Sequence, residues 1–234
     1  RDIVHMEQYL LNHLQINSIQ CAIGGSMGGM IALEFALIDP RIQRAFLMAM
    51  GKAHTAWSIG LSHLQRQAIY QDPHWKEGGY TAEAAPSQGL SLARQIGMMT
   101  YRSPEDYEAK FGRDIREITN HPYYQVESYL DYQGQKLNKR FDALSYERLT
   151  RSMDTHDISR DRGSFKEVAK QLTIPIHVVG ILSDALYPIS EQKDLAQLLP
   201  NGQFTALDSP YGHDAFLIEF DQLTHILSRF LATT

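Results

Sequence analysis

The distribution of hydrophobic residues along the chain predicts an α/β core that is interrupted by a helical segment. Four short apolar runs are typical of buried parallel strands: 19–23, 44–50, 176–180 and 203–207. Apolar residues at helical spacing follow three of these runs, at 30–37, 191–199 and 215–231. Strands that alternate with helices in this way indicate a mostly parallel sheet.

Residues 53–165 have a different character, because they show helical spacing and few strand signals. Breaks at Pro and Gly divide this stretch into five expected helices: 56–70, 87–99, 104–111, 124–139 and 143–153. We therefore expect an α/β core made of 1–52 and 166–234, with 53–165 inserted as a helical cap. Ligands bind at the carboxyl ends of the strands in such sheets, so a cap there would shape the pocket and exclude water.

The first predicted strand, 19–23, needs neighbours on both sides to be buried in a parallel sheet. The sequence starts at Arg1, without Met and directly on a helical pattern. We therefore expect that an upstream segment with further strands is missing from this sequence.

Composition narrows the class of function. The chain has 234 residues, 43% of them hydrophobic, and a formal net charge of -5 without a long basic run. This balance argues against nucleic-acid binding, and no apolar run is long enough to cross a membrane. The single cysteine, Cys21, allows no internal disulfide, which fits a reducing compartment, and we expect the cytoplasm. The run Asp154, His156, Asp157 lacks a matching cluster, so we expect a solvated helix end and no metal site.

The stretch from Ser18 to Asp39 carries the main chemical signal. An apolar run ends in Gly24-Gly25-Ser26-Met27-Gly28-Gly29, and a helix follows. The form G-x-S-x-G between a strand and a helix is typical of a nucleophile elbow, in which the serine sits on a sharp, strained turn. The helix would point its free N–H groups, including that of Met27, at the place where an oxyanion forms. A glycine-rich turn with a solvent-exposed serine is the alternative.

A serine nucleophile needs a base, and the base needs an acid that orients it, in the chain order Ser, Asp or Glu, His for this fold. Asp184 follows the predicted strand 176–180, and His213 follows the strand 203–207. We therefore predict a triad of Ser26, Asp184 and His213. His177 lies inside a strand and is expected to be structural. Either Asp184 or His213 alone would be better explained as an ordinary loop residue.

The chain resembles the homoserine O-acetyltransferases of the α/β-hydrolase superfamily. The matching stretches run over nearly the whole chain, including the predicted cap: G-G-S-M-G-G-M at 24–30, R-Q-A-I at 66–69, Q-G-L-S-L-A-R at 88–94, T-Y-R-S at 100–103, K-F-G-R at 110–113, V-E-S-Y-L-D-Y-Q-G at 126–134, R-F-D-A at 140–143 and Y-G-H-D-A-F-L at 211–217. An ordinary esterase would not share the cap.

The resemblance implies transfer of an acetyl group from acetyl-CoA to L-homoserine by a ping-pong mechanism, as part of methionine biosynthesis, with acetyl-CoA as co-substrate and no resident cofactor. It implies that Arg94 grips the acceptor carboxylate, that Tyr101 is a second contact and that Asp214 holds the ammonium group. From the residues alone, Arg94 could be a surface helix residue and Asp214 the N-cap of the last helix. The resemblance also suggests a homodimer built through the cap helices.

Other functions stay open on the sequence. A hydrolase of small esters would share the triad and would not need Arg94 or Asp214. A succinyl donor or a serine acceptor is a variant of the same transfer. Family members carry an N-terminal segment whose loop donates a second oxyanion N–H, and a chain without it could be an inactive fragment, since a lost oxyanion donor costs about 100- to 1,000-fold in rate.

Overall fold

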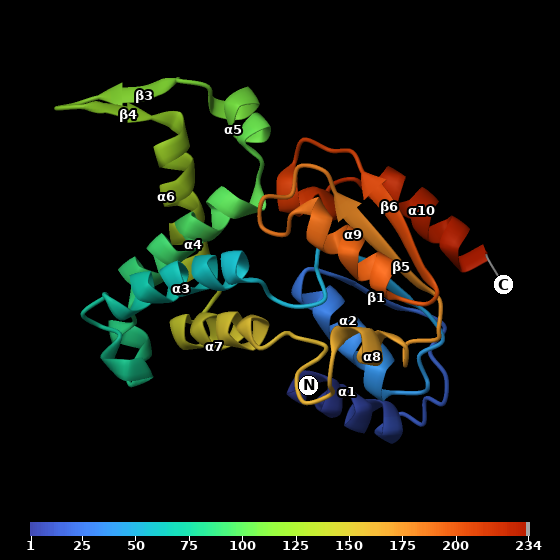
Figure 1. Cartoon of the computed structure of the whole chain (residues 1–234). Helices are drawn as coiled ribbons and strands as arrows, with labels where there is room; N and C mark the ends of the chain where they lie inside the picture. Colours follow the sequence, from blue (N-terminus) through green and yellow to red (C-terminus); the bar gives the residue numbers. More distant parts are fainter. Residues whose placement is uncertain (233–234) are drawn as a thin grey trace. The chain divides into compact units, whose positions relative to one another are not determined.

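The sheet of the core is parallel throughout, with its strands in the order β1-β2-β5-β6 (Figure 1). The computed structural model describes residues 1–232. The strands are β1 (Ala22–Gly25), β2 (Ala45–Met48), β5 (Ile176–Ile181) and β6 (Gly202–Leu207). The accompanying helices are α1 (Asp2–His13), α2 (Met27–Ile38), α8 (Phe165–Ala169), α9 (Ile189–Leu198) and α10 (Phe220–Ala232), and a 3-10 turn, η3 (Gly212–Leu217), precedes α10. The structure confirms an α/β core with a mostly parallel sheet.

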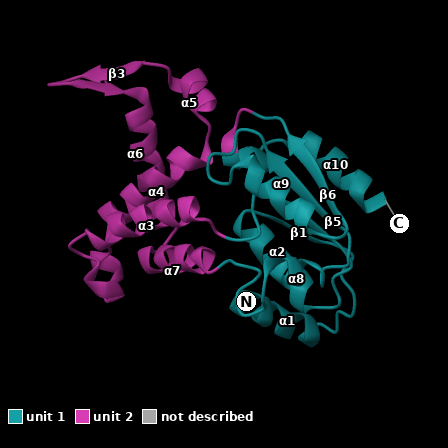
Figure 2. Cartoon of the chain, in the orientation of Figure 1, with its two compact units in different colours: residues 1–53, 156–209, 213–234 teal, residues 54–155, 210–212 magenta. Residues whose placement is uncertain are grey.

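The chain divides into two compact units (Figure 2). Unit 1 contains 1–53, 156–209 and the chain from 213 on, and unit 2 contains 54–155 and 210–212. Residues 156–165, which we expected in the inserted segment, lie in unit 1. The reason is a local pairing of the two connecting segments, since Ala53 forms an antiparallel bridge with Asp157 and the Ile158 N–H donates to the Lys52 carbonyl at 3.2 Å.

Unit 2 is mostly helical. Its helices are α3 (Ala56–Tyr70), α4 (Ser87–Tyr101), α5 (Pro104–Phe111), α6 (Gln125–Asn138) and α7 (Ala143–Asp154), with short 3-10 turns η1 (Lys76–Gly78) and η2 (Ala82–Ala84). Helix α4 packs against both α3 and α6, and α3 packs against α7. The core of the unit joins Ile69, Leu90, Ala93, Leu137 and Tyr146.

Sequence reasoning missed a β-hairpin in unit 2, formed by β3 (Ile115–Ile118) and β4 (Pro122–Tyr124). All four residues of β3 are exposed, so no alternation of buried and exposed positions marks it. The Pro122 that we interpreted as a break opens β4 instead. Proline is tolerated at the first residue of a strand because its missing N–H is not needed there.

The first strand begins three residues later than predicted. It was expected at 19–23, and β1 spans Ala22–Gly25. Ile19 forms only an isolated bridge with Ile42. The glycines that looked like a turn are therefore the last residues of the strand. In the centre of the sheet the match is closer, because every residue of β5 is buried, as a strand with neighbours on both sides should be.

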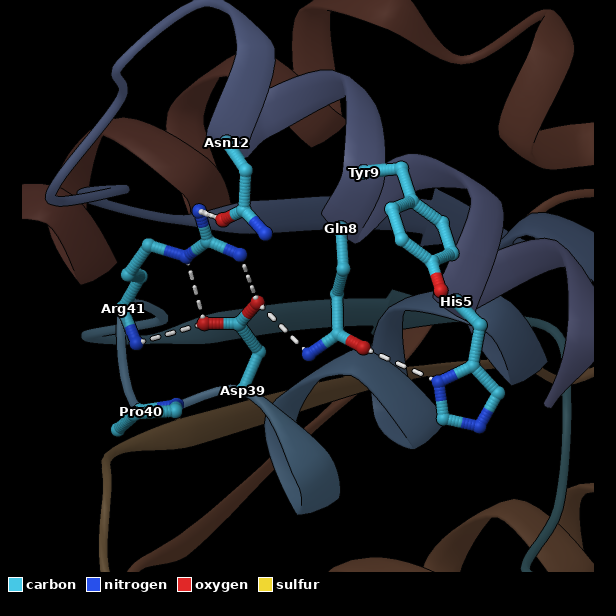
Figure 3. A pocket seen from close by; sticks show the side chains of 7 residues that line it. All are labelled: His5, Gln8, Tyr9, Asn12, Asp39, Pro40 and Arg41. Atoms are coloured by element: carbon cyan, nitrogen blue, oxygen red, sulfur yellow. Dashed lines mark hydrogen bonds and ion pairs between the residues drawn. The ribbon is translucent and has the colours of Figure 1, made fainter.

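An ion pair between the buried Asp39 and the half-buried Arg41 connects the end of α2 to α1. Asp39 accepts hydrogen bonds from the Arg41 guanidinium at 2.6 and 2.9 Å and from Gln8 of α1 at 3.1 Å (Figure 3). Arg41 also donates to the side chain of Asn12 at 2.9 Å and to the carbonyl of Ile16 at 3.2 Å. These bonds use the Arg41 donors within the protein. In the groove of about 440 Å³ that these residues line, the charge of Arg41 is therefore paired with that of Asp39.

The same pair makes stability depend on acidity. Hydrogen bonds from Arg41 lower the pKa of Asp39 to about 2, below its ordinary value of 3.8. A carboxyl group whose pKa is depressed in the folded state contributes stability above its unfolded pKa, and this contribution is lost as the pH falls from about 4 to about 2.

We expect Asp39→Asn to lower the free energy of unfolding at pH 7 by about 2 kcal/mol, because the charge-assisted hydrogen bonds of the buried Asp39 carboxylate are lost. The variant should also lose less stability than the parent between pH 4 and pH 2. Urea unfolding across this range measures both effects. Asp194→Asn, which removes the same charge from a side chain that is 54% exposed beside Lys52, is the control and should change stability by less than about 0.5 kcal/mol. Equal effects of the two variants would contradict the assignment.

Candidate catalytic site

The end of β1 and the start of α2 approach each other so closely that only glycine fits. A Cβ atom on Gly24 would lie 2.2 Å from the backbone carbonyl of Gly28, and one on Gly29 would lie 2.7 Å from the side chain of Met50. Between them, Ser26 adopts φ 53° and ψ -125°, a conformation that a residue with a side chain rarely takes. Its N–H donates to the Met48 carbonyl at 2.8 Å, which ties the turn to β2. The strained turn therefore has the geometry of a nucleophile elbow.

Helix α2 begins directly after the serine. Ser26 is its N-cap and Met27 is its first helical residue. The first N–H groups of a helix have no partner within the helix, and the helix dipole makes this end positive. No atom lies within 4 Å of the place where a Cβ on Gly28 would sit, so the start of the helix has free space beside it. Met27 thus has the position that an oxyanion donor requires.

Asp184 and His213 are joined by a hydrogen bond in the interior of unit 1. The His213 Nδ1 lies 2.8 Å from the Asp184 Oδ2, and the two residues are 4% and 5% exposed. The other carboxylate oxygen accepts the backbone N–H groups of Leu186 and Tyr187 at 2.9 and 2.8 Å. Because a carboxylate oxygen only accepts, Nδ1 carries the proton and Nε2 is the basic nitrogen of the ring.

Two observations place His213 close to the turn that carries Ser26. The strands β1, β5 and β6 are parallel, so Ser26, Asp184 and His213, which follow them, lie at the same edge of the sheet. In addition, the ring of Phe216 lies 5.5 Å from the His213 ring and only 2.6 Å from where a Cβ on Gly25 would sit. The histidine is therefore about one side chain away from the residue that precedes Ser26. This arrangement supports a serine nucleophile with a histidine base and an aspartate that orients it.

Sequence reasoning missed the residues that hold this arrangement. Tyr187 is fully buried, and its ring lies 5.4 Å from that of His213. The buried Gln192 donates to the Tyr187 carbonyl at 2.6 Å, and Ser183 donates to the Ser209 carbonyl at 2.6 Å, which joins the loops after β5 and β6. The only signal in the sequence was the short distance of Tyr187 from Asp184.

Asp214 departs from one expectation drawn from the sequence, whereas His177 agrees with another. Asp214 follows His213 within η3, and α10 begins at Phe220, so Asp214 is not the N-cap of the last helix that we expected from 215. His177 is structural, as expected. It lies within β5 with its Nε2 2.9 Å from the Thr205 hydroxyl, between the rings of Phe46 and Phe230, and burial lowers its pKa.

In unit 2, Arg94 and Tyr101 form a stacked pair on α4. The guanidinium carbon of Arg94 lies 5.2 Å from the centre of the Tyr101 ring. Arg94 is half-buried, and no hydrogen bond or ion pair joins its guanidinium to another residue within 1–232. Arginine on a tyrosine face with its N–H donors unused is well suited to bind a carboxylate with two parallel bonds. The interpretation of Arg94 as an ordinary surface residue is therefore not favoured.

Some expectations about polar residues need correction. Asp154 does not end in solvent, because it forms an ion pair with the buried Arg66 at 2.6 Å. His156 donates to the Gly51 carbonyl at 2.9 Å, and burial lowers its pKa. Cys21 is half-buried just before β1, and burial raises the pKa of its thiol, which disfavours the reactive thiolate. In the part of the chain that the structure describes, no group of three or more His, Cys, Asp and Glu could hold a metal ion.

The helices also bear on whether the chain could span a membrane. Within residues 1–232, none of the helices combines the length and the apolar character that a membrane span requires.

Comparison with known proteins identifies the fold family and similar curated proteins. A family model described as the alpha/beta hydrolase fold matches residues 1–220. The chain is 47% identical over 233 residues to a homoserine O-acetyltransferase of Chlorobium chlorochromatii, and the match covers 99% of this chain and 65% of that protein. It is 44% identical to a homoserine O-acetyltransferase of Salinibacter ruber, with 99% and 67% covered. The chain thus spans about two thirds of the length of these curated relatives.

A solved structure supports the fold. The crystal structure of homoserine O-acetyltransferase from Bacillus anthracis aligns with a TM-score of 0.92 over 100% of this chain and 65% of that one. The sequence identity in this alignment is 23%, so the likeness concerns the fold.

We expect Asp184→Asn to slow labelling of Ser26 by a fluorophosphonate probe about 1,000- to 10,000-fold, with little effect on stability. The amide oxygen can still accept from Leu186 and Tyr187, whereas the amide NH₂ would face His213 and place the ring proton on the wrong nitrogen. Mass spectrometry of the labelled peptide gives the rate. Asp214→Asn, at the neighbouring position of the same turn, should leave the labelling rate within about tenfold of the parent. A parent-like rate in Asp184→Asn would exclude the triad.

Proposed function

Because the chain belongs to the homoserine O-acetyltransferase family within the alpha/beta hydrolase fold, we propose that it transfers an acetyl group from acetyl-CoA to the hydroxyl group of L-homoserine. The observation that carries this choice over a simple esterase is Arg94. Its half-buried guanidinium has no polar partner among residues 1–232, and an amino-acid acceptor brings the carboxylate that it can bind. A small ester offers no such group.

The first half of the reaction uses the residues of unit 1. The Ser26 hydroxyl oxygen attacks the thioester carbon while His213 Nε2 takes its proton, and Asp184 stabilises the imidazolium that forms. The N–H of Met27 at the start of α2 faces the developing oxyanion. The C–S bond then breaks, the CoA thiolate takes the proton from His213, and the acetyl group stays on Ser26.

In the second half, His213 Nε2 takes the proton of the acceptor hydroxyl, and the oxygen attacks the acetyl carbon. The bond to Ser26 breaks, and the serine oxygen regains the proton from His213. Homoserine is a zwitterion at neutral pH, so it needs a cation and an anion at fixed positions. We assign its carboxylate to Arg94 with Tyr101 beside it, and its ammonium group to Asp214.

The remaining assignments belong to the same proposal. No resident cofactor is needed, because acetyl-CoA enters as co-substrate. The product would serve methionine biosynthesis in the cytoplasm, and a single half-buried cysteine fits a reducing compartment. We also propose a homodimer through unit 2, supported by large apolar side chains that are exposed on α3 and α4, namely Trp57, Leu64, Leu92 and Met99.

The proposal predicts that acetyl-CoA alone acetylates Ser26 and releases one CoA per active chain, and that L-homoserine then discharges the enzyme. Mass spectrometry of the Ser26 peptide and a thiol assay check these steps. Ser26→Ala should form no adduct and show no transfer. A panel of acetyl-CoA and succinyl-CoA with homoserine and serine identifies donor and acceptor. Discharge by water alone, at a rate unaffected by any amino acid, would favour an ester hydrolase, and absence of any adduct would favour a non-catalytic fragment.

Arg94→Ala should reduce kcat/KM for homoserine about 100-fold, because a charge-assisted bidentate contact is lost, and should leave the acetylation of Ser26 unchanged. Steady-state kinetics with varied homoserine, beside single-turnover acetylation, separate the two effects. Arg113→Ala is the matched control, since Arg113 also stacks on a tyrosine, Tyr124, at 5.8 Å, and should keep parent kinetics. If Arg94→Ala keeps full transfer to homoserine, the carboxylate contact is wrong.

A further inference from the structure

Beneath the stacked Arg94 and Tyr101, unit 2 contains a buried polar contact between α3 and α7. The hydroxyl of Tyr146 donates to the side-chain carbonyl of Gln65, and the two residues are 9% and 6% exposed. The Gln65 amide in turn donates to the Leu61 carbonyl at 3.1 Å, which fixes its orientation. The ring of Tyr146 is held edge-on by Phe141 at 6.1 Å. Both polar groups are therefore oriented by neighbouring contacts.

The contact between Tyr146 and Gln65 lies close to the stacked pair on α4. A Cβ on Gly97 of α4 would lie 3.3 Å from the Tyr101 hydroxyl and 3.4 Å from the Gln65 carbonyl oxygen, so the two groups converge over the same glycine. Burial raises the pKa of the Tyr146 phenol well above its ordinary value, the neighbouring Tyr101 raises it further, and the Arg94 guanidinium lowers it. Tyr146 thus lies within electrostatic reach of both members of the pair.

We propose that Tyr146 and Gln65 are positioning residues that fix the Tyr101 phenol and, through its ring, the Arg94 guanidinium, and so set the affinity for the carboxylate of an amino-acid acceptor. This role rests on the proposed function, in which Arg94 and Tyr101 meet the acceptor. Neither Tyr146 nor Gln65 touches the reacting atoms in this scheme.

The chemistry of the support suits this role. A neutral phenol and a neutral amide hold the pair in place without supplying a negative charge, so the positive charge of Arg94 stays available for the acceptor. A carboxylate at either position would form an ion pair with Arg94 and compete with the ligand. The absence of a side chain at Gly97 leaves room for both groups, since a Cβ there would lie 3.3 Å from the Tyr101 hydroxyl.

The test is Tyr146→Phe, which removes one hydroxyl and keeps the ring against Phe141. We expect the KM for homoserine to rise about tenfold, with the single-turnover rate of Ser26 acetylation by acetyl-CoA unchanged. Gln65→Leu should raise the same KM, and the double variant should be no worse than the more affected single variant, because the two residues act as one unit. Tyr80→Phe is the control, since its hydroxyl bonds Asp142 and the Leu144 N–H, and its KM should stay within twofold of the parent.

Circular dichroism and the melting temperature of each variant show whether it folds. If Tyr146→Phe is folded and its KM for homoserine is unchanged while the parent protein transfers acetyl groups, the positioning role is wrong and the proposed function stands. An equal loss in acetylation rate and in acceptor KM would also overturn the role, because a general structural defect moves both. A folded parent that transfers nothing to any amino acid overturns the proposed function and, with it, the role of Tyr146.

Discussion

The contact of β1 with α2 at Gly24 and Gly28 is the constraint on which the site depends. Because the two backbones lie closer than any side chain would allow, the chain must reverse within one residue, and that residue is Ser26 with its positive φ. The same closeness lets α2 begin directly after Ser26, at Met27, so the serine is the N-cap of the helix. The close packing of β1 and α2 therefore determines both the strained conformation of Ser26 and the position of Met27 beside it. The loops after β5 and β6 then supply the acid and the base.

The two units contribute ionisable groups in different electrostatic environments. Unit 1 supplies a buried histidine that is hydrogen-bonded to a carboxylate, whose remaining oxygen is fixed by two backbone N–H groups. Unit 2 supplies the Arg94 cation, which stacks on Tyr101 and has no ion-pair partner among residues 1–232. The first arrangement suits a group that must change its protonation state in a defined geometry, and the second suits a group that must keep its charge for a ligand.

Much of this could be predicted from the sequence, because local patterns determine it. Periodicity placed α3 and α5 at the observed residues, and the order of acid and base after two later strands predicted the pair of Asp184 and His213 that the hydrogen bond joins. What escaped prediction depends on contacts between distant residues. The exposed hairpin of β3 and β4 has no buried face to mark it, the second boundary of the insertion is set by the pairing of Ala53 with Asp157, and the Tyr146 and Gln65 contact joins positions 81 residues apart.

Unit 2 is more than a simple insertion, since it includes Pro210–Gly212 from the far end of the chain. Ser103 at the start of α5 donates to the Pro210 carbonyl, and a Cβ on Gly212 would lie 2.6 Å from the backbone of Arg102 and Ser103. The next residue is His213. If unit 2 were exchanged between relatives as the single segment 54–155, Pro210–Gly212 would be left behind. A chimaera must carry both pieces together, and recombination during evolution is subject to the same rule.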